Sequence, residues 1–481
     1  MSLLNYLRPW AWSLEPEASR FGPNSRWSNK DMDPVPAHGR TWTSWNFVAF
    51  WVSNGANVAV WQLSSSMMAV GLSWREALTS IAVAHIIIAV VIVLNGTIGA
   101  RLHVAFPVIT RVSFGFWLSY FSVVSRVVLS MFWFGVQSYT GSECVYQMLK
   151  AIWPSTTHIP NRLPESANIT TAGIMCYFLY WLIQLPLMLL SPAKIRHLFT
   201  AKSIIVPAAW LAILIWAFVK VPANESLAPR HATIGGSDFS WAWLSALNSA
   251  LGIYATLAVN IPDFTASQYV QIAIIPTIFT LVAFTGIAVT SVGETLYGEL
   301  LWDPLHLIDR WDNRAAAFFA SSAFLLATLG TNIASNSLSA ANDMMALLPE
   351  YINIRRGQVI CAIIGGCALV PWEILASAPK FLSFMSGYTV FLGPFSAMYY
   401  WLTRKCKVDV PAMYDPNGRY RYWKGINWRA FVTLLVSVTP NLPGLIHNIN
   451  TDIDVGNASF MFNVSWLTGV GLSSFLYHIV D

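Results

Sequence analysis

Charged residues are scarce in this sequence. Only 11% of its 481 residues are Asp, Glu, Lys or Arg, whereas roughly 25% is usual in soluble proteins. Hydrophobic residues make up 55% of the chain, so the charged ones are too few to coat the roughly three soluble domains that this length would form. The shortage of charge excludes an ordinary soluble protein and predicts a chain surrounded by lipid.

Several functional signatures are also missing. The five cysteines lie mostly inside apolar stretches without metal-ligand spacing, which indicates small buried side chains and no disulfide framework or redox centre. The nine histidines are scattered, and no embedded nucleophile, base or metal cluster indicates a membrane enzyme. The net charge of +5 is spread over short loops, so nucleic-acid binding is not expected. No cofactor is expected either.

Apolar stretches of the length that crosses a bilayer, about 20 residues, recur along most of the chain. The first 44 residues are an exception: they are polar, lack the apolar core of a signal peptide, and are expected to stay in the cytosol. The twelve predicted spans centre on residues 45–70, 77–99, 113–149, 171–190, 202–220, 241–260, 268–292, 315–347, 357–377, 380–402, 428–447 and 460–479. The sequence thus predicts an all-α integral membrane protein with twelve transmembrane helices.

Lys and Arg residues in the connecting loops predict the orientation, because basic residues resist translocation across the membrane. With the N-terminus inside, most of the 28 basic residues, Arg111 and Lys202 among them, are expected on the cytosolic side. Both termini are therefore predicted to be cytosolic. The glycosylation tripeptides that begin at Asn168, Asn224 and Asn457 fall in predicted outer loops, which is compatible with this orientation.

The first span is interrupted at its centre by Ser53-Asn54-Gly55-Ala56-Asn57, residue types that favour turns over helix interiors. A break here frees backbone polar groups at membrane depth, where they are tolerated if they line a cavity or bind a ligand. Asn54 and Asn57 are therefore candidate substrate-binding residues, the alternative being close packing of small residues. Residues 249–256 of the sixth span form a comparable stretch, and matching interruptions indicate two inverted repeats around a central binding site.

The third span carries Trp133 and Gln137, whose i, i+4 spacing places them on one helix face. An indole beside a primary amide suits a planar heterocycle, because the ring can stack and the amide can pair with an N–H/C=O edge. Packing is the alternative for Trp133, since the chain holds 23 tryptophans. Arg126, two turns earlier, is expected to close the cytosolic side by pairing with a carboxylate or with carbonyl groups.

The eighth span, 315–347, is the most polar of the apolar-flanked segments. Ala327, Gly330 and Thr331 share a face and could offer oxygen atoms to a small hard cation. Asn336 follows about 7.5 Å further along the helix axis, where it could reach a substrate beside that cation. Hydrogen bonding between helices is the alternative, but the number of polar groups in this span favours a functional role.

The tenth span contains a stripe of Phe381, Met385 and Tyr388 at i, i+4 and i+7. Such a stripe is more often part of a hydrophobic core than of a gate. Gly387 and the Gly393-Pro394 pair would nonetheless let part of this helix bend, as a gate requires.

Taken together, several motifs resemble the nucleobase-cation symporters, and among them the fungal uracil and allantoin permease branch. The resemblance extends from about Asn29 to the twelfth span. Its motifs are Asn29-Lys30-Asp31-Met32-Asp33-Pro34-Val35-Pro36 with Arg40-Thr41-Trp42, Phe106-Pro107-Val108 with Arg111 and Ser113-Phe114-Gly115, Trp133 with Gln137, Asn260-Ile261-Pro262-Asp263-Phe264, and Thr331-Asn332 with Ser335-Asn336.

This resemblance implies a leucine-transporter-type fold that works by alternating access. The expected organisation is a cytosolic segment (1–44), two inverted five-helix repeats (45–220 and 241–402) and two peripheral helices (428–479). A small heterocyclic substrate and the lipid bilayer are the implied partners, and the plasma membrane is the implied location. The implied activity is import of uracil, allantoin, uric acid or a related heterocycle by cation symport.

The resemblance also implies residue roles. Trp133 would stack on the substrate, Gln137 and Asn336 would bind its polar edge, and Tyr254 would stand where a bacterial hydantoin transporter of the family has a tryptophan. Met385 and Tyr388 match positions that gate access. The implied cation site joins broken helix one to Ala327, Gly330 and Thr331 on helix eight.

Coupling to protons is preferred over coupling to sodium. Gly330 stands where the sodium-coupled relative has a serine, so one side-chain oxygen is lost from the implied cation site. The alternatives are a sodium-coupled permease of the family, or one specific for cytosine, purines, nucleosides or vitamins. A passive channel is a further alternative, but it would show rings or repeats of one polar residue type along a pore.

Overall fold

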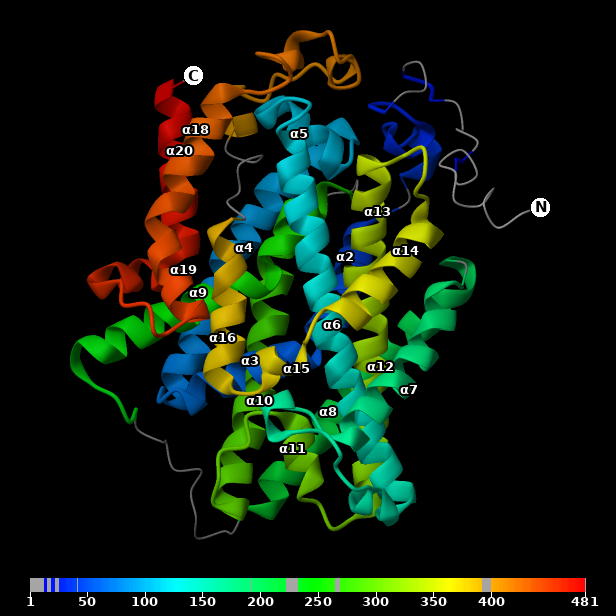
Figure 1. The fold of residues 1–481 in the computed structure, drawn as a ribbon, viewed down its shortest axis with the longest axis vertical. Helices are drawn as coiled ribbons and strands as arrows, with labels where there is room; N and C mark the ends of the chain where they lie inside the picture. Colours follow the sequence, from blue (N-terminus) through cyan, green and yellow to red (C-terminus); the bar gives the residue numbers. More distant parts are fainter. Residues whose placement is uncertain are drawn as a thin grey trace.

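A bundle of helices makes up the computed structural model (Figure 1), and the residues it describes include no β-strand. The structure describes residues 13–14, 19–21, 26–40, 42–190, 192–221, 232–263, 269–391 and 399–480. Thr41, Asn224, Phe264, Gly393 and Pro394, which the sequence analysis singles out, lie outside these residues.

The helices follow the predicted spans in order. Those of the first half are α2 (Ser44–Gly55), α3 (Val58–Ala69), α4 (Trp74–Leu102), α5 (Phe106–Phe114), α6 (Ser119–Ile152), α7 (Thr171–Met188) and α8 (Pro192–Lys220). Those of the second half are α9 (Gly236–Asn260), α10 (Gln271–Tyr297), α11 (Pro304–Asp309), α12 (Arg314–Thr331), α13 (Leu338–Leu347), α14 (Ile354–Ile363), α15 (Trp372–Leu375), α16 (Ala378–Gly387), α18 (Trp428–Val438), α19 (Leu442–Ile449) and α20 (Ser465–Val480).

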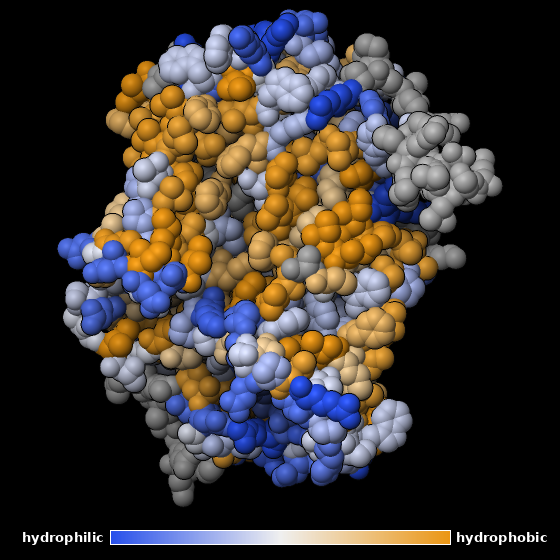
Figure 2. Space-filling model, in the orientation of Figure 1, coloured by the Kyte–Doolittle hydropathy of each residue, from blue (hydrophilic) through white to orange (hydrophobic). Residues whose placement is uncertain are grey.

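Eight helical stretches within the described ranges are long and apolar enough to cross a membrane. They are Trp74–Leu102, Ser119–Ile152, Glu165–Met188, His197–Lys220, Gly236–Asp263, Gln271–Tyr297, Arg314–Leu347 and Trp428–Ile449. The first, ninth, tenth and twelfth predicted spans are covered by shorter helices. Figure 2 shows hydrophobic residues in a broad band across one face, with hydrophilic residues at the two ends and in one group at the left edge; such a band is expected for a protein surrounded by lipid.

The predicted break in the first span is confirmed. Helix α2 ends at Gly55 and α3 begins at Val58, with Ala56 and Asn57 between them. Asn57 is the N-cap residue of α3, and its Oδ1 accepts a hydrogen bond from the Ala59 N–H at 3.1 Å. The cap satisfies one of the backbone donors that a helix start leaves open.

The predicted break in the sixth span is wrong, because α9 runs through residues 249–256 as one helix. Small residues serve close packing against α16 here. A Cβ atom at Gly252 would overlap the carbonyl oxygen of Met385, and the Ser249 hydroxyl donates to the Leu382 carbonyl at 3.1 Å. Small side chains that bring two helix backbones together are the packing alternative to a break.

The predicted limits of two other spans also need correction. Helix α8 begins ten residues earlier than the predicted fifth span, at Pro192, so Lys202 lies inside the helix and is only 1% exposed. It is therefore no residue of a cytosolic loop. The predicted ninth span is too long: α14 ends at Ile363, a π-helical turn covers Ile364–Ala368, and the short α15 follows.

Arg111 also differs from the predicted loop residue. It lies in α5 and is buried, and its guanidinium donates to the Trp27 carbonyl at 2.8 Å and to the Met413 carbonyl at 3.0 Å. These contacts tie the segment 26–40, α5 and the loop before α18 together at one end of the molecule (Figure 1). The C-terminal part of α20 reaches the same end.

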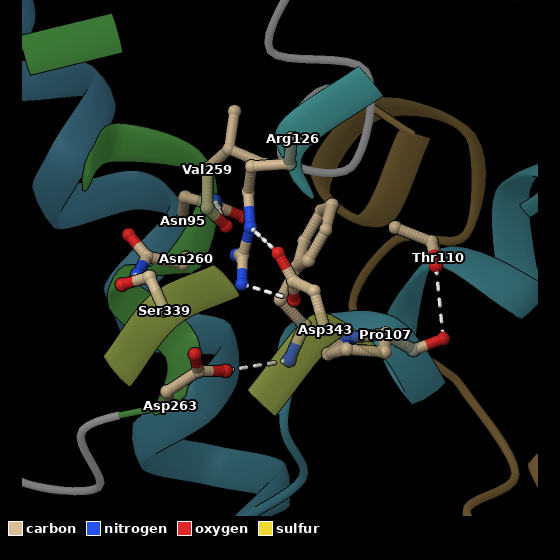
Figure 3. A network of polar contacts seen from close by, with 10 residues as sticks. Asn95, Pro107, Thr110, Arg126, Val259, Asn260, Asp263, Ser339 and Asp343 are labelled. Atoms are coloured by element: carbon tan, nitrogen blue, oxygen red, sulfur yellow. Dashed lines mark hydrogen bonds and ion pairs between the residues drawn. The ribbon is translucent and has the colours of Figure 1, made fainter. Parts of the chain in front are cut away.

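Arg126 pairs with a carboxylate, as expected. Its guanidinium makes two hydrogen bonds to the carboxylate of Asp343 on α13, and both side chains are completely buried. Figure 3 shows this pair beside Asp263, which accepts a hydrogen bond from the N–H of Phe106 at the start of α5. The pair therefore joins α6 to α13, next to the contact between α5 and the 3-10 turn Ile261–Asp263 that follows α9.

We expect Arg126→Ala to destabilise the protein by about 3–5 kcal/mol, because it leaves the Asp343 carboxylate buried and unpaired. Thermal unfolding of the purified protein in detergent measures this. Combining Arg126→Ala with Asp343→Ala should restore much of the loss, since no single charge is then left behind. Lys380→Ala is the control: its pair with Glu373 is exposed and is worth about 0–1 kcal/mol. A loss for Arg126→Ala no larger than that control would contradict the expectation.

Candidate functional site

A cavity with a volume of about 40 Å³ lies between α2, α3, α6, α9, α12 and α13. The lining residues are Asn54, Asn57, Ser130, Trp133, Gln137, Ile253, Tyr254, Thr256, Leu257, Asn260, Thr331, Ser335, Asn336 and Ser339. The structure thus brings together all six residues predicted to bind substrate, Trp133, Gln137, Tyr254, Asn336, Asn54 and Asn57, together with Thr331 of the predicted cation site.

The break in helix one supplies two asparagines to this cavity. Asn57 Oδ1, which caps α3, also accepts a hydrogen bond from Gln137 Nε2 at 3.0 Å. Asn54 is held at both ends of its amide: Nδ2 donates to the Phe50 carbonyl at 2.9 Å, and Oδ1 accepts from the Ser335 hydroxyl at 2.8 Å. The break therefore links α2 and α3 to helices α6 and α12–α13.

Aromatic rings form the apolar part of the wall. Trp133 lies one turn from Gln137 on α6, and its ring packs edge-to-face against Phe384, with centroids 5.6 Å apart. The Tyr254 hydroxyl donates to the carbonyl of Asn54 at 3.1 Å, a group left free by the helix break. Its ring packs on Phe279 with centroids 4.3 Å apart. Both rings are therefore fixed by neighbours while they line the cavity.

The polar eighth span changes its helical geometry at the cavity. A π-helical segment, Asn332–Ser337, separates α12 from α13. Such segments are frequent at functional sites, because the wider turn redirects side chains. Within it, Asn336 Nδ2 donates to Asn332 Oδ1 at 2.8 Å. The many polar residues of this span predicted its functional role, but the sequence pattern did not predict the π-helical segment.

The region predicted to hold a coupling cation contains a lysine. Lys202 Nζ donates to the Thr331 hydroxyl at 2.7 Å. Its aliphatic chain lies against Gly330, where an added Cβ would be 2.6 Å from Lys202 Cδ. Ala327 is buried one turn before Thr331 on α12. Sequence reasoning missed Lys202 because the predicted span began at this residue; the one signal was a single charge next to a long apolar stretch.

The predicted gate residues Phe381, Met385 and Tyr388 do not line the cavity. Phe381 and Met385 are completely buried, and Phe381 stacks on Trp302 with centroids 5.9 Å apart. Phe384, which the sequence analysis did not single out, is the residue of α16 that contacts Trp133. A gating role for the predicted three stays a prediction.

The chemistry of the wall restricts what the cavity can bind. Its lining consists of amides, hydroxyls, two aromatic rings and aliphatic groups, and none of the lining residues carries a charge. An ion would lose its hydration there without a compensating partner, and this is unfavourable. The described residues also include no group of three or more His, Cys, Asp and Glu side chains that could hold a metal ion. The arrangement suits a neutral, polar, planar molecule.

Several similar proteins of known sequence are permeases. The curated relatives include three from Saccharomyces cerevisiae: uridine permease (34% identical, covering 94% of this chain and 74% of the relative), allantoin permease (33%, covering 94% and 75%) and uracil permease (33%, covering 92% and 74%).

The fold resembles that of a solved transporter, Mhp1, a member of the nucleobase-cation-symport-1 family. With Mhp1 in a closed conformation with bromovinylhydantoin bound, the TM-score is 0.71 at 19% identity, and 94% of each chain is covered. With its inward-facing conformation the TM-score is 0.72, also at 19% identity, covering 94% of this chain and 92% of the other. This likeness confirms the predicted fold class, a leucine-transporter-type membrane protein.

The family comparison confirms the resemblance seen in the motifs. Residues 34–469 match the model of one family, described as "Permease for cytosine/purines, uracil, thiamine, allantoin". The match spans most of the chain and includes every residue that lines the cavity. The chain therefore belongs to this family of nucleobase permeases, which are transport proteins and not enzymes.

Proposed function

We propose that the chain imports a neutral heterocycle of the uracil or allantoin type by proton symport. The observation that carries the substrate class is the uncharged wall in which Trp133, Gln137 and Asn336 surround one cavity. An indole provides a stacking surface for a planar ring, and the amides provide partners for its N–H and C=O groups. The names of the uracil and allantoin permease relatives support the same class. Uridine is a competing substrate, because the uridine permease is equally similar.

The choice of the proton rests on Lys202. Its ammonium group is hydrogen-bonded to Thr331 and its aliphatic chain packs on Gly330, so Lys202 already supplies a positive charge at the predicted cation position. A sodium ion in the same place would meet that charge at close range and be repelled. A lysine amine can instead lose and regain a proton, and buried lysines do so readily. This supports proton coupling over the sodium-coupled alternative.

The proposed location is the plasma membrane, with both termini in the cytosol. Support comes from the basic residues of the loops and from the shared end at which α5, segment 26–40 and the end of α20 lie (Figure 1). In this orientation α11 and the loop after α6 face the outside.

The first test of this proposal removes the two amides separately. We expect Gln137→Ala and Asn336→Ala to abolish uptake while protein still reaches the plasma membrane, because each loses a partner of the ligand's polar edge, at a cost of about 1–3 kcal/mol. Uptake of radiolabelled uracil, allantoin, uric acid, cytosine, purines and uridine measures this. Near-normal uptake kinetics in both variants, for every substrate that the unmodified protein transports, would refute the assigned site.

A second test concerns coupling. Uptake should rise as external pH falls from neutral, because each unit of inward proton gradient adds about 1.4 kcal/mol, a factor of about ten in accumulation. It should be abolished by a protonophore and unchanged when choline replaces sodium. Lys202→Met should equilibrate the substrate without concentrating it, whereas the exposed Lys380→Met should behave like the unmodified protein. Strict sodium dependence, or undiminished accumulation by Lys202→Met, would contradict proton coupling through this lysine.

A further inference from the structure

We propose that two fixed chains of hydrogen bonds turn the oxygen atoms of Gln137 and Asn336 towards the ligand. The cavity would then select heterocycles that present two N–H donors, as the –NH–CO–NH– group of a ureide does. This inference rests on the proposed substrate site and narrows its substrate class. It also assigns Asn332 and Asn57 as positioning residues, which act on the ligand through Asn336 and Gln137.

The first chain begins at a backbone carbonyl, the oxygen of Phe134 on α6. Asn332 Nδ2 donates to this oxygen at 3.1 Å. Because a carbonyl can only accept, the Asn332 amide has one permitted orientation. Two neighbours hold it in that orientation, since Asn332 Nδ2 also lies 2.8 Å from Gln184 Oε1 and 3.2 Å from the Ser138 hydroxyl. Asn332, Gln184 and Ser138 are each 0% exposed, so water cannot replace these partners.

The orientation of Asn332 determines that of Asn336. Because Asn332 Nδ2 donates to groups on α6, its Oδ1 points towards Asn336. This oxygen accepts a hydrogen bond from Asn336 Nδ2 at 2.8 Å. A reversed Asn336 amide would set two carbonyl oxygens against each other, which is unfavourable in a buried site. Asn336 therefore keeps Oδ1, an acceptor, for the cavity that it lines.

The second chain begins at the N-terminus of α3. The N–H of Ala59 needs an acceptor there, and Asn57 Oδ1 provides it. The same Oδ1 accepts from Gln137 Nε2, so the Gln137 amide is also fixed in one orientation. Its Oε1 is buried and has no hydrogen-bond partner among the residues that the structure describes. A buried acceptor without a partner is unfavourable, and a ligand N–H would relieve this.

The ligand chemistry follows from the two free oxygen atoms. Uracil carries N1–H and N3–H on either side of a carbonyl, and allantoin contains the same –NH–CO–NH– group. A ligand that offers a ring nitrogen lone pair or an N-methyl group at either place meets an oxygen that it cannot satisfy. Sites built around such directed hydrogen bonds discriminate strongly, because the mismatched group stays unpaired.

The test begins with ligands and the unmodified protein. Inhibition constants for radiolabelled uracil uptake are measured for 1-methyluracil, 3-methyluracil and 1,3-dimethyluracil. Thymine and 6-methyluracil serve as controls, because they carry the same added methyl on carbon. We expect each N-methyl compound to bind at least about tenfold more weakly than both controls. N-methyl compounds that bind as tightly as the controls would overturn the proposal.

A variant then tests the positioning role. Asn332→Ala frees the Asn336 amide to rotate, so the preference for uracil over its N-methyl derivatives should fall about tenfold or more for at least one of them. A merely structural loss would weaken all ligands alike and leave this ratio unchanged. Thr328→Ala is the matched control, because Thr328 is completely buried one turn earlier and its hydroxyl bonds the Phe324 carbonyl. An unchanged ratio in folded Asn332→Ala refutes the positioning role.

The outcomes separate this inference from the proposed function. If the protein neither binds nor transports uracil, allantoin or the other heterocycles, the proposed function itself fails. If Gln137→Ala and Asn336→Ala abolish uptake but N-methylation has no effect, the site stands and only its donor and acceptor assignment is wrong. If Asn332→Ala does not fold, the ligand series on the unmodified protein still decides whether the cavity selects ligands with two N–H donors.

Discussion

The arrangement of the cavity depends on the hydrogen bonds that Asn57 Oδ1 accepts at the helix break. A helix that stops inside a membrane must give its open backbone groups partners from the protein itself. Asn57 Oδ1 meets this need for the N–H of Ala59, and the same atom holds Gln137 of α6. The constraint that makes the break tolerable thus also orients a residue of the proposed substrate site.

No charged side chain lines the cavity, and the buried charges near it lie behind the lining residues. Arg126 and Asp343 neutralise each other between α6 and α13, and Lys202 meets the hydroxyl of Thr331 from α8. The space between these groups is left to amides, hydroxyls and rings. Because the lining is uncharged, the protein can bind a neutral solute without removing an ion from water. The buried charged groups outside the lining still hold neighbouring helices together.

The sequence predicted the order of the helices, the break at Asn54–Asn57 and several residues of the cavity, because each leaves a local signal; Tyr254 was implied only by the family resemblance. Polar residues at helical spacing within apolar stretches identified Trp133, Gln137 and Asn336. The break expected at 249–256 was wrong because small residues serve both helix breaks and close packing, and only the position of α16 beside Gly252 distinguishes the two. Lys202 was missed because the predicted span began at this residue, which placed it in a cytosolic loop, and its partner Thr331 is far away in the chain. Donor and acceptor orientations, as in Asn332, depend on such distant partners and could not be predicted.

In the proposed mechanism, the proton-carrying lysine and the substrate-binding Asn336 contact two successive residues, Thr331 and Asn332. Thr331 accepts from Lys202, and Asn332, the next residue, begins the π-helical segment and orients Asn336. While Lys202 is protonated, it can only donate, so the Thr331 hydroxyl is held as an acceptor and its own proton points elsewhere. Deprotonation removes this requirement and lets the hydroxyl turn. Because Thr331 lines the same cavity as Asn336, this turn changes the donor and acceptor pattern of the wall, while Asn336 itself stays held by Asn332 and the Phe134 carbonyl.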